Sequence, residues 1–248
     1  MNGFRLLAVL AGICFSNPAF ASDKAAFIPA AFGPKTQSVI DKIKFPESDK
    51  NVSVNVYCEA QVSIRGEVKL KFCFTAGRNV DRDDFSFAVS RAFHRVRISP
   101  AFVGGKRVLS TIQFMVKFVK VGVEEQINLY PNFDLNREYG SDYIAPQYYW
   151  ERDRTDRCDN KANIALSLVV NEDGKPENIE ILNKGLSEFC SSYFVSIIER
   201  RKYIPAFYDG RPVRSRHIDY LNIGRADSRF SLGIYRHILY IQSRDNTR

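Results

Sequence analysis

Cysteine is the residue type with the clearest chemistry in this sequence of 248 residues. Four cysteines follow residue 21, and their spacings do not match those of a structural zinc site. An even number in an exported chain is typical of disulfides. We therefore predict two bonds among Cys58, Cys73, Cys158 and Cys190. Three connectivities are open, and proximity along the chain favours Cys58 with Cys73 and Cys158 with Cys190.

The first 21 residues predict that the chain is exported. A basic residue, Arg5, precedes the ten-residue apolar run LLAVLAGICF, and small residues end the segment at Ala21. This order is typical of a cleaved secretory signal, and a spanning helix needs about 20 apolar residues. We expect a mature chain that starts at Ser22, with an uncleaved membrane anchor as the alternative.

The charge of the chain bears on its partners. Removing residues 1–21 lowers the net charge only from +8 to +7, because Arg5 is the one charge lost. Nucleic acid is not an expected partner of an exported protein with so mild a basic excess. A solvated basic surface is favoured over a face that binds acidic peptides or anionic lipid head groups.

Other potential catalysts do not form a recognisable set. The sequence contains neither the G-x-S-x-G nor the H-E-x-x-H motif, and with both disulfides formed no cysteine nucleophile is left. His94 and His217 are both expected at the surface rather than as catalytic bases. Asp81, Asp83 and Asp84 lack the glycine and closing glutamate of a calcium loop and are better explained as helix caps. We therefore predict no enzyme activity, no metal and no other cofactor.

The elements that position these residues are predicted by a repeat. The segment RISPAFVGGKRV at 97–108 returns 105 residues later as KYIPAFYDGRPV at 202–213. In both copies an amphipathic helical pattern precedes the segment, a proline ends it, and a glycine turns the chain into a further strand. The second helix has Ser187 as its candidate cap.

A hairpin pattern precedes each helical pattern. The turns of the two hairpins lie at Gly66 and Gly174, and in both the next glycine follows eleven positions later. Apolar residues alternate over 164–170, as in a half-buried strand, and a change of phase after Pro176 indicates a bulge.

These patterns predict an α+β fold of two tandem β-β-α-β units, each an antiparallel sheet covered by one helix. The predicted divisions are a signal at 1–21, an N-terminal segment at 22–44, a first unit at 45–120, an aromatic-rich connector at 121–157, a second unit at 158–224 and a tail at 225–248.

Aligning the two hairpins bears on the first disulfide. Cys58 then corresponds to Leu166 and Cys73 to Ile181, which both face the core of the second copy. A shared bulge would make the two cysteines cross-strand neighbours within bridging range. A plain three-residue turn around Gly66 would instead place Cys73 on the opposite face, and we favour the bridge.

The second unit resembles the TonB C-terminal domain, the periplasmic end of bacterial energy transducers. The resemblance covers about residues 160–223 and rests on the alternating strand before the D-G turn, the I-E-I-L run after the bulge, and the R-R-x-Y-x-P-A helix end. That motif comprises Arg200, Arg201, Tyr203, Pro205 and Ala206. The first unit matches more weakly, because Arg97 and Ser99 flank Ile98 where the family has a basic and aromatic ending.

The resemblance implies a periplasmic binding module that captures a short segment of a partner, such as an outer-membrane receptor, by strand addition at its third strand. Carried over to this sequence, the binding edge is Val213, Arg214, Ser215, Arg216, His217 and Ile218, and residues 108–112 are its counterpart in the first unit.

This chain also departs from the family's energy transducers. Its N-terminus is typical of a cleaved signal, and residues 22–44 are too short for a spacer across the periplasm. The leading hypothesis is therefore an exported protein that binds a protein or peptide in the cell envelope. The alternatives are an anchored energy transducer and a structural or assembly subunit of the envelope.

Overall fold

A computed structural model describes residues 26–76, 82–133, 139, 142–149, 163–182 and 186–222 of the chain. The predicted signal, Cys158 and the predicted tail lie outside the described residues. The described part is an α+β structure with antiparallel sheets, as the sequence predicts. None of the helices in this part is long and apolar enough to cross a bilayer.

The largest sheet, called the first sheet below, is built around two long strands. β2 (Val52–Val62) pairs along its whole length with β6 (Ser110–Val121), and on its other side with β3 (Val68–Ala76). The far side of β6 pairs with β7 (Glu124–Tyr130) and β8 (Gln147–Tyr149), which both come from the predicted connector. The end expected for the first unit therefore falls inside the β6–β7 hairpin.

Three further strands form the second sheet. β9 (Asn163–Val170) is central, with β10 (Pro176–Ile181) on one side and β14 (Ser215–Asn222) on the other. The predicted bulge is confirmed by a register shift between Glu177 and Glu180. The first sheet has the same order around β2, with β3 and β6 as its neighbours.

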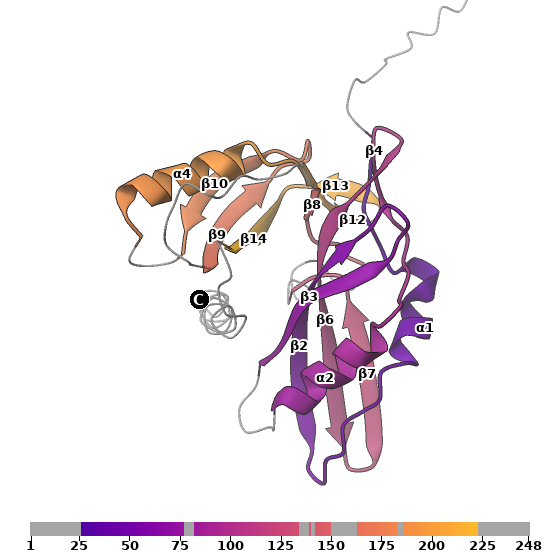
Figure 1. Cartoon of the computed structure of the whole chain (residues 1–248). Helices are drawn as coiled ribbons and strands as arrows, with labels where there is room; N and C mark the ends of the chain where they lie inside the picture. Colours follow the sequence, from indigo (N-terminus) through magenta and orange to yellow (C-terminus); the bar gives the residue numbers. More distant parts are fainter. Residues whose placement is uncertain are drawn as a thin grey trace, which may run out of the picture.

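One helix covers each sheet (Figure 1). α2 (Arg82–Ala92) lies across the first sheet and packs Phe85 and Val89 onto it. α4 (Glu188–Glu199) lies over the second sheet, and its predicted cap is confirmed because Ser187 Oγ accepts a bond from the Cys190 backbone N–H. Asp84 lies within the first turn of α2 rather than at a cap.

The N-terminal segment is part of the first core. It contains β1 (Phe27–Ile28), the 3₁₀ helix η1 (Gly33–Lys35) and α1 (Thr36–Ile40). Four of its apolar side chains, Ala30, Phe32, Val39 and Ile43, are buried in the same core as β2 and β6. The stretch predicted as a separate segment is therefore folded onto the first sheet.

The repeated segment forms a small hairpin in both copies. In the first, β4 (Ala101–Val103) pairs with β5 (Lys106–Val108), and β1 adds to β4. In the second, β12 (Ala206–Tyr208) pairs with β13 (Arg211–Val213). Just before it, β11 (Tyr203–Ile204) pairs with β8 and so joins the second copy to the first sheet.

The turn glycines fix where these corners lie. The carbonyl of Gly66 accepts a bond from the Ile98 N–H at 2.8 Å, and that of Gly174 accepts one from the Tyr203 N–H at 3.1 Å. A Cβ at Gly66 would lie 2.1 Å from the Ile98 carbonyl oxygen, and one at Gly174 would lie 2.0 Å from that of Tyr203. Both glycines also have positive φ angles, of 80° and 76°. Only glycine therefore allows the hairpin turn to meet the corner this closely.

We predict that Gly174→Ala lowers the free energy of unfolding by about 2–4 kcal/mol, because the new Cβ combines left-handed strain with a backbone clash. The matched control is Gly210→Ala, where φ is 70° but no atom lies within 4 Å of the added Cβ. Its loss is expected to be about 1 kcal/mol, the strain alone. Chemical denaturation of both variants measures the difference, and equal losses would show that the close approach is unimportant.

Candidate functional site

The predicted binding edge spans the end of β13 and the start of β14. β14 pairs with β9 along one side, and no described strand pairs with its other side, which we call the outer edge. Arg214 and Arg216 are exposed, whereas Ser215, His217 and Ile218 are buried. Half of the predicted edge therefore serves the interior of the molecule.

Alternation along β14 decides which backbone groups face outward. In an antiparallel pair, every second residue directs its N–H and C=O away from the partner strand. The Ile218 carbonyl accepts a bond from the side chain of Gln113, so Ile218 faces outward. By the same period, Arg216 and Tyr220 also direct their backbone groups to the outer edge.

The first sheet already covers part of this edge. Gln113 Nε2 donates to the Ile218 carbonyl at 2.9 Å and also lies 3.3 Å from Glu59 Oε2. The Tyr143 hydroxyl is hydrogen-bonded to Ser215 Oγ at the start of β14. We call the contact of β14 with Gln113 and Glu59 the junction.

Residues 108–112, the expected counterpart in the first unit, do not offer an open edge. Val108 pairs with Ala101 in the corner hairpin, and Ser110 and Thr111 pair with β8. From Met115 onward, β6 pairs with β7. The chain itself thus occupies the side of β6 that corresponds to the outer edge of β14.

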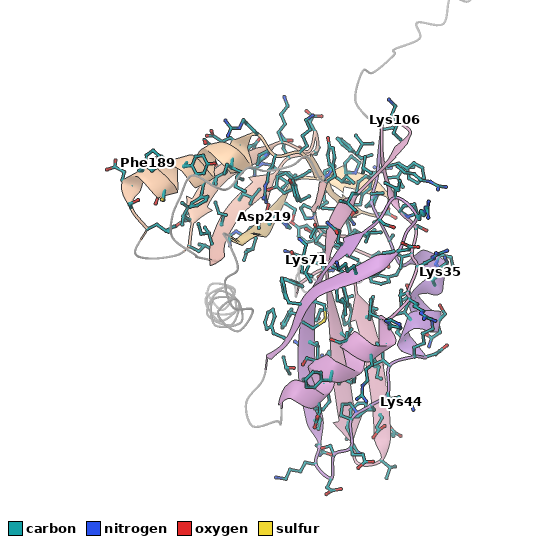
Figure 2. All side chains as sticks on the ribbon, in the orientation of Figure 1. Lys35, Lys44, Lys71, Lys106, Phe189 and Asp219 are labelled. Atoms are coloured by element: carbon teal, nitrogen blue, oxygen red, sulfur yellow. A yellow bond between two sulfur atoms is a disulfide. The ribbon has the colours of Figure 1, made fainter. Side chains whose placement is uncertain are left out.

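A buried polar cluster lies beside the junction, where β14 meets β11 and the end of α4. It consists of Arg201, Tyr203, His217 and Asp219, which are 9%, 1%, 6% and 7% exposed. Arg201 Nη1 donates to Asp219 Oδ2 at 2.6 Å, and the Tyr203 hydroxyl donates to the same oxygen at 2.5 Å. Figure 2 shows Asp219 and Lys71 in the region where the two sheets meet.

Aromatic rings enclose this polar cluster. The Arg201 guanidinium lies 4.2 Å from the centre of the Tyr148 ring on β8, a cation–π contact with the first sheet. The His217 ring meets the Tyr203 ring edge to face at 5.7 Å. His217 is therefore buried, contrary to the surface position expected from the sequence, whereas His94 is exposed.

The first copy has apolar side chains at the equivalent positions. The registers of the two sheets match: Cys58 lies opposite Phe114 as Leu166 lies opposite Asp219, and Ala60 lies opposite Ile112 as Leu168 lies opposite His217. Going back 105 residues from the polar cluster leads to Val96, Ile98, Ile112 and Phe114, which are all buried. The fold therefore does not require polar groups at these four positions.

The cluster sets the protonation states of its members. Burial, with the Asp219 carboxylate beside it, raises the pKa of Tyr203 well above its ordinary value, so the phenol stays protonated and donates. Burial alone would raise the pKa of Asp219, but Arg201 and the other donors hold it below its ordinary value. Burial also lowers the pKa of His217, against the opposing pull of Asp219 and Glu59.

This arrangement holds three parts of the second copy together. The Asp219 carboxylate ties the end of α4 and β11 to β14, and its ionised form is already paired. Among the described residues, no three His, Cys, Asp or Glu side chains come close enough together to share a metal ion.

The predicted disulfide between Cys58 and Cys73 is confirmed. The two cysteines lie directly opposite each other on β2 and β3, and a register shift between Glu59 and Ala60 places them so. Cys190 is also disulfide-bonded. Its predicted partner, Cys158, lies outside the described residues, so that pairing stays a prediction.

The chain matches no protein-family model, no curated protein and no solved structure. The resemblance to TonB C-terminal domains therefore rests on the residues quoted above. Sequence reasoning found Arg201 and Tyr203 as parts of a motif but missed that they pair with Asp219. The 105-residue offset between the copies could have indicated this pair, because Arg201 and Asp219 stand where the first copy has the apolar residues Val96 and Phe114.

We predict that Asp219→Asn lowers the free energy of unfolding by about 3–5 kcal/mol, because it removes the carboxylate charge that is paired with the buried Arg201 guanidinium. The quadruple variant Arg201→Val, Tyr203→Ile, His217→Ile and Asp219→Phe, which copies the first sheet, is expected to be as stable as the native chain or more so. Urea denaturation compares the two variants.

The control is a surface ion pair, Arg97 with Glu67, whose side chains are 63% and 50% exposed. Glu67→Gln is expected to change the free energy of unfolding by less than about 1 kcal/mol. A quadruple variant that is less stable than Asp219→Asn would mean that the second copy depends on its polar cluster for folding.

Proposed function

We propose that the protein is exported to the bacterial cell envelope and binds an extended segment of a partner protein as an added strand on the outer edge of β14. The observation that carries this proposal is the pairing on the outer side of β6, with β8 at Ser110 and Thr111 and with β7 from Met115 to Val121. It indicates that the corresponding edge of this scaffold accepts a further strand. The same edge of β14 has no described strand beside it.

Backbone pairing supplies the affinity in this binding mode, and side chains beside the edge supply selectivity. The outward N–H and C=O groups of Arg216 and Tyr220 are the groups that such a segment would meet. Arg216 is exposed. Arg214, two residues before it, forms an ion pair with Glu177 on β10, with 3.1 Å between Arg214 Nη2 and Glu177 Oε2. The resemblance to TonB C-terminal domains supports the same edge, with an outer-membrane receptor segment as a candidate partner.

The N-terminal segment favours an exported binding protein over an anchored energy transducer. A transducer needs an extended spacer between its anchor and its binding module. Here the residues from Phe27 to Val39 form short elements and bury side chains in the first core. They are therefore not available as a spacer.

A structural or assembly role is the second candidate, and the junction favours it. Gln113 already holds the Ile218 carbonyl, and Tyr143 holds Ser215. An edge that is partly engaged within the chain is also how natural proteins avoid unwanted strand pairing. In this alternative, the two sheets are packed for rigidity and β14 receives no partner.

We predict that Arg216→Pro reduces partner capture by about tenfold or more, because it removes an outward N–H and places a ring at the edge without removing a bond to β9. The measurement is in-cell crosslinking from a photoreactive residue at the exposed Arg214 position, with crosslinked peptides identified by mass spectrometry.

The matched control is Arg216→Ala, which keeps the backbone N–H and is expected to retain capture. Thermal unfolding of both variants confirms that the fold is intact. Crosslinks that are unchanged in Arg216→Pro would exclude the outer edge as the binding site and favour the structural role.

A further inference from the structure

The junction joins the outer edge of β14 to the face of the first sheet that lies opposite α2. On that face, Glu59 is 4% exposed and Gln113 is 6% exposed. Lys71 Nζ donates to Glu59 Oε1 at 3.0 Å, so the glutamate is held between Lys71 and Gln113. This set of side chains positions the Gln113 amide on the Ile218 carbonyl.

His217 precedes that carbonyl in the chain and belongs to the buried cluster. Charged and titratable groups face it from every neighbouring element: Asp219 on β14, Arg201 after α4, Tyr203 on β11 and Glu59 on β2. Lys71 on β3 and Tyr148 on β8 contact Glu59 and Arg201 respectively. Histidine is the side chain that ordinarily changes charge between about pH 5 and pH 8.

The first copy shows what a purely structural interior looks like at this position. Ile112 stands where the second copy has His217, and Phe114 stands where it has Asp219. Buried charged groups are often less stabilising than apolar residues of similar size. Their best-attested use is to select one arrangement over another, which here is the closed junction.

We propose that the junction is an acid-opened latch: protonation of His217 favours a state in which β14 separates from Gln113 and Glu59, so that its whole outer edge becomes accessible. Binding of a partner strand to the exposed edge rests on the function proposed above. The opening itself does not.

The direction follows from linkage. Burial lowers the pKa of His217 in the closed state, whereas a hydrated histidine titrates near its ordinary value. A proton therefore binds the open state more tightly, and acid shifts the population toward it. Asp219, whose pKa is held low, keeps its charge across the same pH range. From about pH 7.5 to about pH 5.5, the opening equilibrium is expected to rise by up to about tenfold.

The test is amide hydrogen exchange of the full mature chain at those two pH values, after correction for the intrinsic pH dependence of exchange. The outward amides of β14, at Arg216, Ile218 and Tyr220, are expected to lose protection at the lower pH because opening exposes them to water. Peptides from β2 and β6 are expected to keep their protection. His217→Phe, which retains a ring beside Tyr203, is expected to abolish the change in β14.

The exposed His94 provides the control, since His94→Gln is expected to leave the change in β14 intact. His217→Ile, the residue of the first copy, replaces His217→Phe if that variant does not fold. Equal protection of native β14 at both pH values would overturn the latch, and so would an acid response that persists without His217. Acid opening without any edge-dependent crosslinking would instead contradict the proposed function and leave the latch supported.

Discussion

A single backbone contact determines how each copy of the repeat is assembled. The carbonyl of a turn glycine meets the N–H of the residue two positions before the corner proline, Ile98 in one copy and Tyr203 in the other. This contact fixes the distance between the hairpin and the end of the helix. The corner then fixes the residue at which the third strand begins to pair. As a result, β6 pairs with β2 in the same register in which β14 pairs with β9.

Because the register is the same, the two interiors can be compared position by position. In the first copy four apolar side chains fill the space beside the third strand, and in the second an ion pair, a phenol and an imidazole fill it. Arg201 also reaches Tyr148, so the polar side chains link the second copy to the first sheet. Apolar side chains at these positions would also stabilise the second copy. With them, however, the contact between the second copy and the first sheet would not depend on charged groups.

Features set by local patterns could be predicted from the sequence. The hairpins, the bulge after Pro176, the Ser187 cap and the Cys58–Cys73 pair all follow from alternation, spacing and turn chemistry. The pairing of β8 with β6 and β11 could not, because three-residue strands joined over long separations leave no periodic signal. The burial of His217 was also missed, although the 105-residue offset places His217 at the position of the apolar Ile112 in the first copy.

The outer edge of β14 reflects two opposing requirements. An edge strand that is open to every extended chain promotes aggregation, and an edge that is fully paired cannot bind a partner. In the first sheet β7 pairs along β6 and so covers the edge of β6. In the second sheet Gln113 engages the Ile218 carbonyl through a side chain rather than a strand. A side-chain contact can be released without unfolding either sheet, so β14 can be protected in one state and available in another.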